Sequence, residues 1–333
     1  MARRLAMYAL ALHPFSLAKS SSGGGVEYVY DPTAFKLPSD SPPMLHGHGL
    51  AKDLDGTIYF TYVVNATTPG PNDRCLVQFA PQNGVYSGEG KMIGDPLLSQ
   101  GTPHGLRIDS DSDLYHANNN QVVRKTSLDG TIKWTTFDPP NNDSAYWPYM
   151  PTDAVVAPPG SNNLFVSDGY GSSFVHLMDA ESGEWSNLTF GGPSGGGSDH
   201  GQLNTPHGIN WDPRVDLLLI SDRSNGRLEY YQLDGQYHST AVETGSFLSQ
   251  PCNVDIDQAS GLALVPDLDG PTYVMDGDNQ LVSTIDVPGD AAAAGDDGFQ
   301  HPHDAIFLPS GDVLVCTWNP GRLGLWRKVV EES

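Results

Sequence analysis

Histidines recur at matching places along this chain, in a pattern that indicates metal binding. The segments GTPHGLRID at 101–109 and NTPHGINWD at 204–212 nearly repeat each other, and HGHGL from 46 and HPHDAIF from 301 are similar. Two further segments, MPTDAVV from 150 and QPCNVDI from 250, have the same form without the histidine. Aligned on the residue after the proline or its equivalent, the six segments superpose His48, His104, Thr152, His207, Cys252 and His303.

Histidines at one aligned position can share one site if the fold brings the six segments to a common axis. Converging neutral imidazoles are ligands for zinc or another divalent transition metal. Three of them with an open position make a catalytic site, whereas four close a tetrahedral zinc and make a structural one. His46 and His301, each two residues before an aligned histidine, add His-x-His pairs. The alternative is that the histidines hydrogen-bond turn carbonyls and only stiffen the structure.

The elements that must position these residues are short β-strands. The chain has 37 glycines and 26 prolines among 333 residues, and no long stretch has apolar residues at helical spacing. Each aligned segment opens a unit of roughly 45–58 residues with about four short strands, the pattern of a propeller blade. Six units predict one all-β domain over 26–333, a six-bladed β-propeller of NHL-type repeats. Two β-sandwiches would explain the strands but not six openings in one register.

The propeller prediction places the aligned residues together. The first strand of every blade lines the central channel, so equivalent residues become neighbours there. We therefore expect a central metal-binding channel. The last unit ends after GRLGLWRKVVEES, which leaves its blade incomplete, and VEYVYD at 26–31 is expected to supply the closing strand. Closing the ring in this way removes exposed sheet edges.

The charge of the chain restricts its partners. Forty acidic residues against 17 basic ones give a formal net charge of −23, which repels phosphate backbones and anionic membrane surfaces. We expect no nucleic acid and no membrane as partner, and a small-molecule or peptide substrate in the central channel. The acidic residues are scattered through turns, as on a solvated surface. Cys75, Cys252 and Cys316 allow at most one disulfide.

The N-terminal segment has the pattern of an export signal. Two arginines precede a short apolar run at 5–12 and the sequence SLA at 16–18, which predicts a signal peptide over 1–18. A Ser/Gly linker follows at 19–25. Glycosylation sequons occur at Asn65, Asn142 and Asn187. The expectation is a secreted or luminal glycoprotein.

The order of the blade openings resembles one enzyme family, the peptidyl-α-hydroxyglycine α-amidating lyases. The shared phrases are PHGLRID in the second blade, PTDAVV with LFVSDGY in the third, PHGI with ISDRSNGR in the fourth, and PHDAIF in the last. The resemblance implies zinc held by His104, His207 and His303. It also implies a structural calcium bound by the Asp304 carboxylate and the main-chain carbonyl of Leu106.

The same resemblance implies that Tyr170 is the general base and that Arg223 faces the substrate. A free tyrosine has a pKa of about 10, so a Tyr170 phenolate needs the metal or an arginine beside it. The zinc would bind a substrate hydroxyl and lower its pKa. Each residue has a structural alternative: packing over the channel for Tyr170, an ion pair with Asp222 for Arg223, and a turn cap for Asp304.

The sequence also departs from the family around the metal. The family's carboxylate-binding arginine in the first blade has no counterpart in IYFTYVV at 58–64, and the cysteine after the family's tyrosine is Gly171 here. The family has no histidine at the first opening, and it has a methionine where this chain has His301. These departures predict the same scaffold with a different substrate, with His48 as a fourth ligand or second base and His301 beside the catalytic group.

Three functions follow from this pattern. The preferred one is a metal-dependent lyase that cleaves a C–N or other C–heteroatom bond next to a hydroxyl or carboxylate. The second is a non-enzymatic NHL propeller that binds a peptide or protein partner and uses its metal structurally. The third is a zinc-dependent propeller hydrolase, although the acidic pair expected of calcium-dependent lactonase propellers is not evident. The sequence predicts no oligomeric state.

Overall fold

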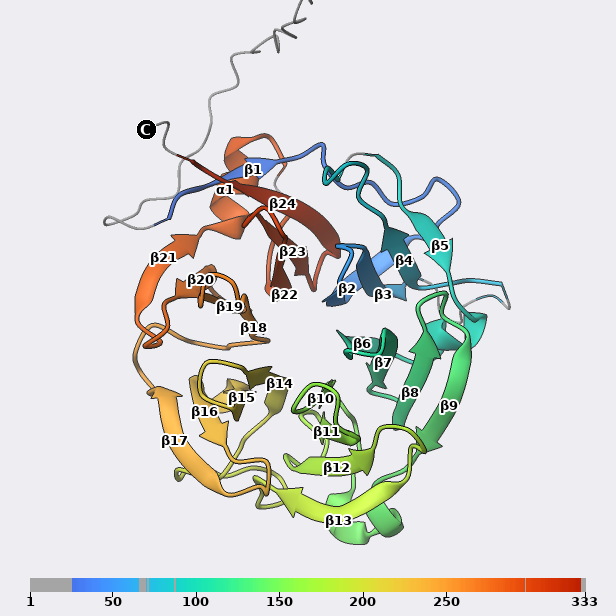
Figure 1. The fold of residues 1–333 in the computed structure, drawn as a ribbon, viewed down its shortest axis with the longest axis vertical. Helices are drawn as coiled ribbons and strands as arrows, with labels where there is room; N and C mark the ends of the chain where they lie inside the picture. Colours follow the sequence, from blue (N-terminus) through green and yellow to red (C-terminus); the bar gives the residue numbers. More distant parts are fainter. Residues whose placement is uncertain (1–25, 66–69, 71, 87, 297, 331–333) are drawn as a thin grey trace, which may run out of the picture.

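The protein forms a ring of six β-sheets around a central axis (Figure 1). The computed structural model describes residues 26–65, 70, 72–86, 88–296 and 298–330. Each sheet has four strands, and hydrogen-bonded neighbours run antiparallel. The six-bladed β-propeller predicted from the repeated segments is therefore confirmed.

The first three blades are built from consecutive strands, named here from the axis outward. Blade 1 consists of β2 (Met44–Lys52), β3 (Ile58–Val64), β4 (Leu76–Phe79) and β5 (Lys91–Ile93). Blade 2 consists of β6 (Pro103–Ile108), β7 (Asp113–Asn118), β8 (Val122–Ser127) and β9 (Ile132–Phe137). Blade 3 consists of β10 (Asp153–Val156), β11 (Asn163–Ser167), β12 (Val175–Asp179) and β13 (Trp185–Phe190).

The last three blades complete the ring, and the sixth uses strands from both ends of the chain. Blade 4 consists of β14 (Pro206–Asp212), β15 (Leu217–Asp222), β16 (Arg227–Tyr231) and β17 (Tyr237–Val242). Blade 5 consists of β18 (Asp255–Ile256), β19 (Ala263–Pro266), β20 (Thr272–Met275) and β21 (Leu281–Ile285). Blade 6 consists of β22 (Pro302–Phe307), β23 (Val313–Thr317), β24 (Arg322–Lys328) and β1 (Tyr28–Asp31).

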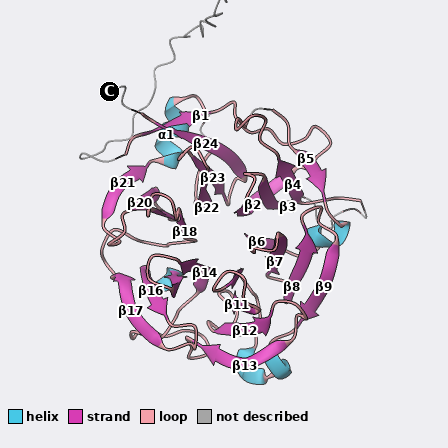
Figure 2. Ribbon diagram, viewed as in Figure 1, coloured by secondary structure: helices cyan, strands magenta, loops and turns pink. Residues whose placement is uncertain are grey.

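Helices are short and lie in the connections between strands (Figure 2). They are α1 (Val287–Ala293) and the 3-10 helices η1 (Pro96–Ser99), η2 (Pro140–Asn142), η3 (Ser144–Tyr146) and η4 (Arg223–Asn225). Of these, η4 bears on the site, because it follows the second strand of blade 4 directly. In the described residues no helix is long and apolar enough to cross a bilayer.

Acidic residues fix the turns between the inner strands. The Asp53 carboxylate after β2 accepts hydrogen bonds from the backbone N–H groups of Asp55 and Thr57, at 3.1 and 2.8 Å. The Asp109 carboxylate after β6 accepts from Asp111 and Asp113 in the same way, at 2.9 Å each. Asp side chains favour such turns because they replace a backbone acceptor. Part of the negative charge of the chain thus comes from aspartates that hold the turns of the repeated hairpins.

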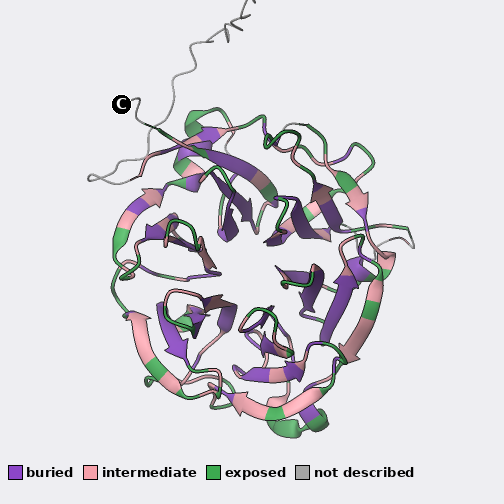
Figure 3. Cartoon of the chain, in the orientation of Figure 1, coloured by how far each residue is buried: buried purple, intermediate pink, exposed green. Residues whose placement is uncertain are grey.

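Burial decreases from the axis outward (Figure 3). Every residue of β22 is buried, whereas the outer strand β9 consists of half-buried and exposed residues. Apolar residues such as Phe165 and Leu218 fill the space between neighbouring sheets. This packing holds the inner strands in place, and with them the side chains that face the axis.

The N-terminal strand β1 closes the ring, as predicted from VEYVYD. It pairs with β24 from Tyr28 opposite Lys328 to Asp31 opposite Leu325. Tyr30 packs on Trp326, with ring centres 4.9 Å apart. The two ends of the chain therefore contribute strands to the same sheet, the sixth blade.

Several predictions concern the ends and the surface of the chain. The predicted signal peptide at 1–18 and linker at 19–25 lie outside the described residues. Asn65, Asn142 and Asn187 are exposed, so the three sequons lie where glycosylation can reach them. The three cysteines are buried and free, so none of them forms a disulfide.

Candidate metal centre and active site

Four histidines meet at the centre of the propeller. His48, His104, His207 and His303 lie on the inner strands of blades 1, 2, 4 and 6, and each is between 1% and 3% exposed. We call them the axial histidines. The rings of His104, His207 and His303 form a triangle with centres 4.8 Å apart on every side. The His48 ring lies 4.5 Å from His104 and 4.6 Å from His303.

Three of these rings are anchored in the same way, each to the following blade. The Nδ1–H of His104 donates to the Thr152 carbonyl at 2.7 Å, that of His207 to the Cys252 carbonyl at 2.6 Å. The Nδ1–H of His303 donates to the His48 carbonyl at 3.0 Å. Because a carbonyl only accepts, Nδ1 carries the proton and Nε2 keeps its lone pair. This second contact is what fixes the orientation of metal-binding histidines.

Close packing of the inner strands makes these bonds possible. The residue after His104 is Gly105, and a Cβ there would lie 2.5 Å from the Thr152 carbonyl oxygen. After His207, a Cβ at Gly208 would lie 2.7 Å from the Cys252 carbonyl oxygen. Only glycine permits such an approach. In each of these His-Gly pairs, the histidine is the candidate ligand, and the glycine lets the carbonyl of the next blade come close enough to bind its ring.

The Nε2 atoms differ in their partners. Those of His104 and His303 are buried without a hydrogen-bond partner, and so are both ring nitrogens of His48. His207 Nε2 instead accepts from the Tyr170 hydroxyl at 3.0 Å. A buried polar nitrogen without a partner is costly, and a bound metal ion would satisfy it.

Burial keeps the axial histidines neutral. It lowers the pKa of His48, His104 and His207 well below the ordinary value, and that of His303 to about 3. Neighbouring axial histidines lower these pKa values further. A metal ion therefore does not compete with protons for these nitrogens near neutral pH.

Donor atoms near the axis form two groups that could hold a metal. One group contains His48, His104 and His303, and the other contains His207, Cys252 and His303; within each, the ligand atoms lie within 4.8 Å of one another. His303 belongs to both. The rings of the predicted ligands His104, His207 and His303 lie together at the axis. Their donor atoms divide, however, with His104 grouped with His48 and His207 grouped with Cys252.

Tyr170 and Arg223 lie next to this cluster and contact each other. Tyr170 is in the connection from β11 to β12, and Arg223 opens η4 after β15. The Arg223 Nη1 donates to the Tyr170 oxygen at 2.9 Å, and the guanidinium carbon lies 4.9 Å from the ring centre. Burial raises the pKa of Tyr170, and Arg223 opposes this by favouring the phenolate. Tyr170 and Arg223 therefore form a hydrogen-bonded pair, and the Tyr170 hydroxyl also contacts His207 Nε2.

The structure excludes the structural alternative for Arg223. Asp222, the suggested partner of Arg223, pairs with Arg227 instead, at 2.7 Å. The connection that contains Tyr170 is held by the Asp168 carboxylate, which accepts from the backbone N–H of Met150 at 2.6 Å. A Cβ at Gly171 would overlap this carboxylate, so glycine suits the position that the family gives to a cysteine.

Asp304 belongs to a polar layer next to the axial histidines. Its carboxylate accepts from the Leu50 N–H at 2.8 Å and from the Asn253 side chain at 2.9 Å. The Arg107 guanidinium pairs with Asp153 at 2.9 Å and also donates to Asn253. Burial raises the pKa of Asp304 and the charge of Arg107 partly opposes this, with the result that the pKa is about 8.

The polar layer bears on the predicted calcium. Calcium prefers several oxygen ligands, among them ionised carboxylates. Here the oxygens of Asp304 already accept hydrogen bonds, and Arg107 places a positive charge in the same layer. These residues fit a layer braced by Arg107 better than a calcium site. The calcium on Asp304 and the Leu106 carbonyl stays a prediction.

His301 and His46 lie at the edge of the cluster. His301 Nδ1 lies 3.0 Å from the Leu268 carbonyl oxygen, and the backbone has a positive φ of 57°. His46 Nδ1 lies 3.0 Å from the Trp318 carbonyl oxygen, and its ring stacks on Trp318. Both side chains bind neighbouring backbone, and neither belongs to the two donor groups. The catalytic role of His301 stays a prediction.

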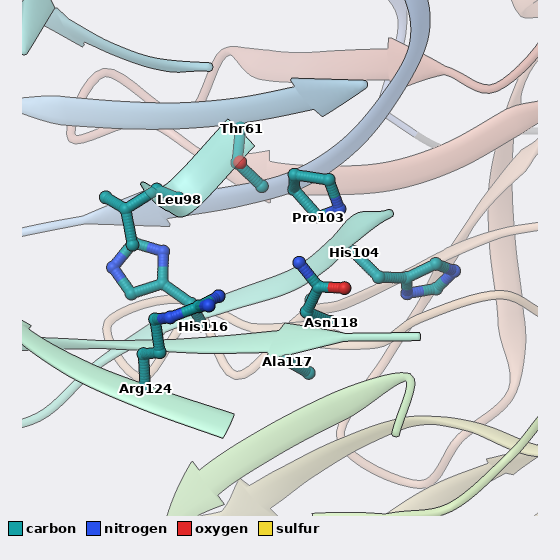
Figure 4. Close-up of a pocket in the computed structure, with 9 residues that line it drawn as sticks. Thr61, Leu98, Pro103, His104, His116, Ala117, Asn118 and Arg124 are labelled. Carbon is teal, nitrogen blue, oxygen red and sulfur yellow. The ribbon is translucent and has the colours of Figure 1, made fainter. Parts of the chain in front are cut away.

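A narrow cleft lies between blades 1 and 2, on the outer side of His104 (Figure 4). It is lined by side chains that include Thr61, His116, Asn118 and Arg124, and it does not admit a water-sized molecule. Figure 4 shows the His104 ring pointing away from Arg124 and His116. The cleft is therefore separate from the axial site and too narrow for a substrate.

Curated proteins with similar sequences are amidating enzymes. No protein-family model matches the chain. The peptidylglycine alpha-amidating monooxygenase of Rattus norvegicus is 29% identical over 151 residues, which are 44% of this chain and 15% of that protein. Peptidyl-alpha-hydroxyglycine alpha-amidating lyase 1 of Drosophila melanogaster is 26% identical over 254 residues, 66% of this chain and 43% of that protein. The resemblance seen in the blade openings is confirmed, although the matches span less than half of either relative.

Solved structures with a similar fold include enzymes. A gluconolactonase from Xanthomonas campestris superposes with a TM-score of 0.63 at 14% identity and covers 97% of this chain and 99% of its own. A virginiamycin B lyase from Staphylococcus aureus gives 0.53 at 11% identity and covers 86% and 85%. At such identities the likeness shows the fold.

Two residues of the site were not assigned a role from the sequence. Cys252 occupies the aligned position in blade 5, so the alignment itself contained the signal. Arg107 lies in PHGLRID, three residues after His104, but its contacts with Asp153 in the neighbouring blade and with Asn253 in blade 5 depend on the assembled ring.

Proposed function

We propose that this chain, a six-bladed propeller similar to the amidating lyases, is a metal-dependent lyase that cleaves a C–N or other C–heteroatom bond beside a hydroxyl group. The observation that carries the proposal is the position of Tyr170, whose hydroxyl lies 3.0 Å from His207 Nε2 and 2.9 Å from Arg223 Nη1. The Tyr170 oxygen as proton acceptor, the Arg223 cation and the nitrogens of the axial histidines lie together there, as such a reaction requires.

His104, His207 and His303 are the proposed ligands of zinc or another divalent transition metal. For His207 this requires that the Tyr170 hydroxyl, which donates to its Nε2, gives up that hydrogen bond. The symmetric triangle of their rings and their Nδ1 anchors support this choice. When bound, the metal would lower the pKa of a substrate hydroxyl. His48 lies beside this set with both ring nitrogens unpartnered, and we propose it as a fourth ligand or a second base.

Tyr170 is the proposed base. Its phenolate would take the proton of the substrate hydroxyl; the O–H electrons then form a C=O bond, and the C–N bond breaks towards nitrogen. The nitrogen takes a proton from the solvent and leaves as the amide, and the Tyr170 phenol returns its proton to the solvent. Arg223 would stabilise the phenolate through its hydrogen bond, because burial alone raises the pKa of Tyr170.

The test joins metal analysis to turnover of an α-hydroxyglycine peptide to glyoxylate and the peptide amide. We expect a bound transition metal in the purified protein, and a loss of turnover of at least about 100-fold in Tyr170→Phe with its metal content unchanged. Tyr146→Phe, in η3 between blades 2 and 3, is the matched control and should keep full activity. A protein without the metal, or full turnover in Tyr170→Phe, would refute the proposal.

A second function is supported by His48. Because its ring lies within 4.6 Å of both His104 and His303, four histidines could close the coordination sphere of a structural metal in a partner-binding propeller. His48→Ala separates the two functions. A closed site should lose its metal in this variant, whereas a catalytic site built on the other three histidines should keep it. Lactone and ester substrates in the same assay test the hydrolase.

We also propose that the protein is exported and glycosylated. The exposure of Asn65, Asn142 and Asn187 supports this proposal. Expression in a eukaryotic secretory system should give a product whose gel mobility increases after treatment with an N-glycosidase. Retention in the cytosol without any mobility change would count against it.

A further inference from the structure

Cys252 occupies the place in blade 5 that a histidine occupies in four other blades. It is completely buried, and its sulfur lies with ligand atoms of His207 and His303 in a group whose members are within 4.8 Å of one another. The His303 Nε2 in this group is buried without a hydrogen-bond partner. A thiol and two imidazoles at this spacing are the donors of a zinc or cobalt site.

The backbone holds Cys252 firmly in this position. Its N–H donates to the Pro266 carbonyl at 2.8 Å, and its own carbonyl accepts the Nδ1–H of His207 at 2.6 Å. The thiol donates a long hydrogen bond to the Gln250 carbonyl, at 3.6 Å, and the Arg223 side chain donates to the sulfur. Loss of the thiol proton on metal binding would therefore cost only the long contact with Gln250.

The other two cysteines have different surroundings. Cys75 in blade 1 lies 3.7 Å from the Thr61 hydroxyl, and Cys316 on β23 lies 3.4 Å from the His48 carbonyl oxygen. Among the described residues, Cys252 is the cysteine that groups with two axial histidines. The Arg223 guanidinium also lies next to the Cys252 sulfur and would balance the charge of a thiolate.

We propose that Cys252 binds the axial metal as a thiolate, together with His207 and His303, in the ligand position that the proposed function gives to His104. The metal then keeps three protein ligands and an open position. This rests on the proposed function only in assuming that the axial site holds a metal. A thiolate favours zinc, cobalt and other soft or borderline ions over magnesium and calcium. It also makes the coordination differ from an all-histidine site.

Cobalt(II) replaces zinc and reports its ligands through its absorption spectrum. Loaded with cobalt, the full-length protein should show the visible bands of a low-symmetry site and a thiolate-to-cobalt charge-transfer band in the near ultraviolet. Cys252→Ser and Cys252→Ala should lose the charge-transfer band and keep the visible bands. Cys75→Ala and Cys316→Ala are the matched controls and should keep both.

Zinc affinity gives an independent readout. In competition with a chromophoric chelator, both Cys252 variants should bind zinc at least about tenfold more weakly than wild type, with circular dichroism unchanged. Visible bands without a charge-transfer band in wild type, or a band that persists in Cys252→Ala, would overturn the thiolate ligand and leave the lyase proposal standing. A protein that binds no cobalt or zinc would overturn both.

Discussion

At the scale of single residues, the site depends on how one arginine changes one tyrosine. Tyr170 is buried, which disfavours its phenolate, and Arg223 is the neighbour that favours it. The hydroxyl can donate to His207 because that ring carries its proton on the opposite nitrogen. The Cys252 carbonyl thus fixes the tautomer of His207, and Arg223 favours the phenolate of Tyr170.

Arg223→Gln tests this dependence. Without the guanidinium the pKa of Tyr170 should rise further, so turnover at neutral pH should fall about 100-fold and the rise of activity should move to higher pH. The measurement is the pH profile of kcat/KM, with Arg223→Lys as a partial rescue because it restores the charge. An unchanged profile in Arg223→Gln would show that Arg223 does not act on Tyr170.

Arg107 gives a second prediction at this scale, for stability. It is buried and pairs with Asp153, so its removal leaves a buried carboxylate without its cation. Arg107→Leu should lower the free energy of unfolding by about 3–5 kcal/mol, measured with urea. Adding Asp153→Asn should recover part of the loss, since the unpaired charge is then gone. Equal stability of the single and double variants would contradict this account.

At the scale of elements, the inner strands explain how much the sequence could predict. The repeated openings predicted six blades and the convergence of His104, His207 and His303, because equivalent positions of a closed ring must face its axis. The anchoring of each ring to the next blade depends on inter-blade distances that no alignment contains. Arg107 was missed for the same reason: its partners, Asp153 and Asn253, are far along the chain and adjacent only in the ring.

Blade 3 carries a buried histidine that should make the protein sensitive to acid. His176 on β12 packs against Tyr146, Tyr149, Phe174 and Trp185, and burial lowers its pKa to about 3. Between pH 6.5 and 3 the unfolded chain therefore binds a proton that the folded blade does not. This histidine costs stability as the pH falls, by about 1.4 kcal/mol per pH unit.

His176→Phe should remove that cost while keeping the aromatic packing. Between pH 7 and pH 5, the free energy of unfolding of metal-free wild type should fall by about 2 kcal/mol more than that of the variant. Urea unfolding at several pH values measures the difference. His238→Phe, at an exposed position on β17, is the control and should follow the wild-type curve. Parallel curves for wild type and His176→Phe would contradict the prediction.

At the scale of the whole molecule, the axial site requires a closed ring, because the blades that supply it are not consecutive. The histidine on blade 6 donates to the carbonyl of the histidine on blade 1, so the seam between the two ends of the chain runs through the site. That seam is held by β1, which contributes the buried Tyr28 and Tyr30 to the sixth sheet. Loss of the closed ring should therefore also disrupt the arrangement of the axial histidines.

A protein that begins at Pro32, and so lacks β1, tests this coupling. Each buried tyrosine side chain stabilises the fold by about 3–5 kcal/mol, so the loss of both should exceed about 5 kcal/mol, comparable with the whole stability of many domains. The truncated protein should unfold at lower urea concentration and bind zinc more weakly than wild type. Zinc binding at full affinity would separate the site from ring closure.

The control restores the strand at the other end of the chain. Because Tyr28 lies opposite Lys328 in the antiparallel pair, β24 can continue into β1 through a two-residue Asn-Gly turn placed between Val329 and Glu27. This permuted protein, running from Pro32 to Val329 and then through residues 27–31, should recover wild-type stability and zinc affinity. If it stays as unstable as the truncated protein, the contribution of β1 lies in its original connection rather than in closing the sheet.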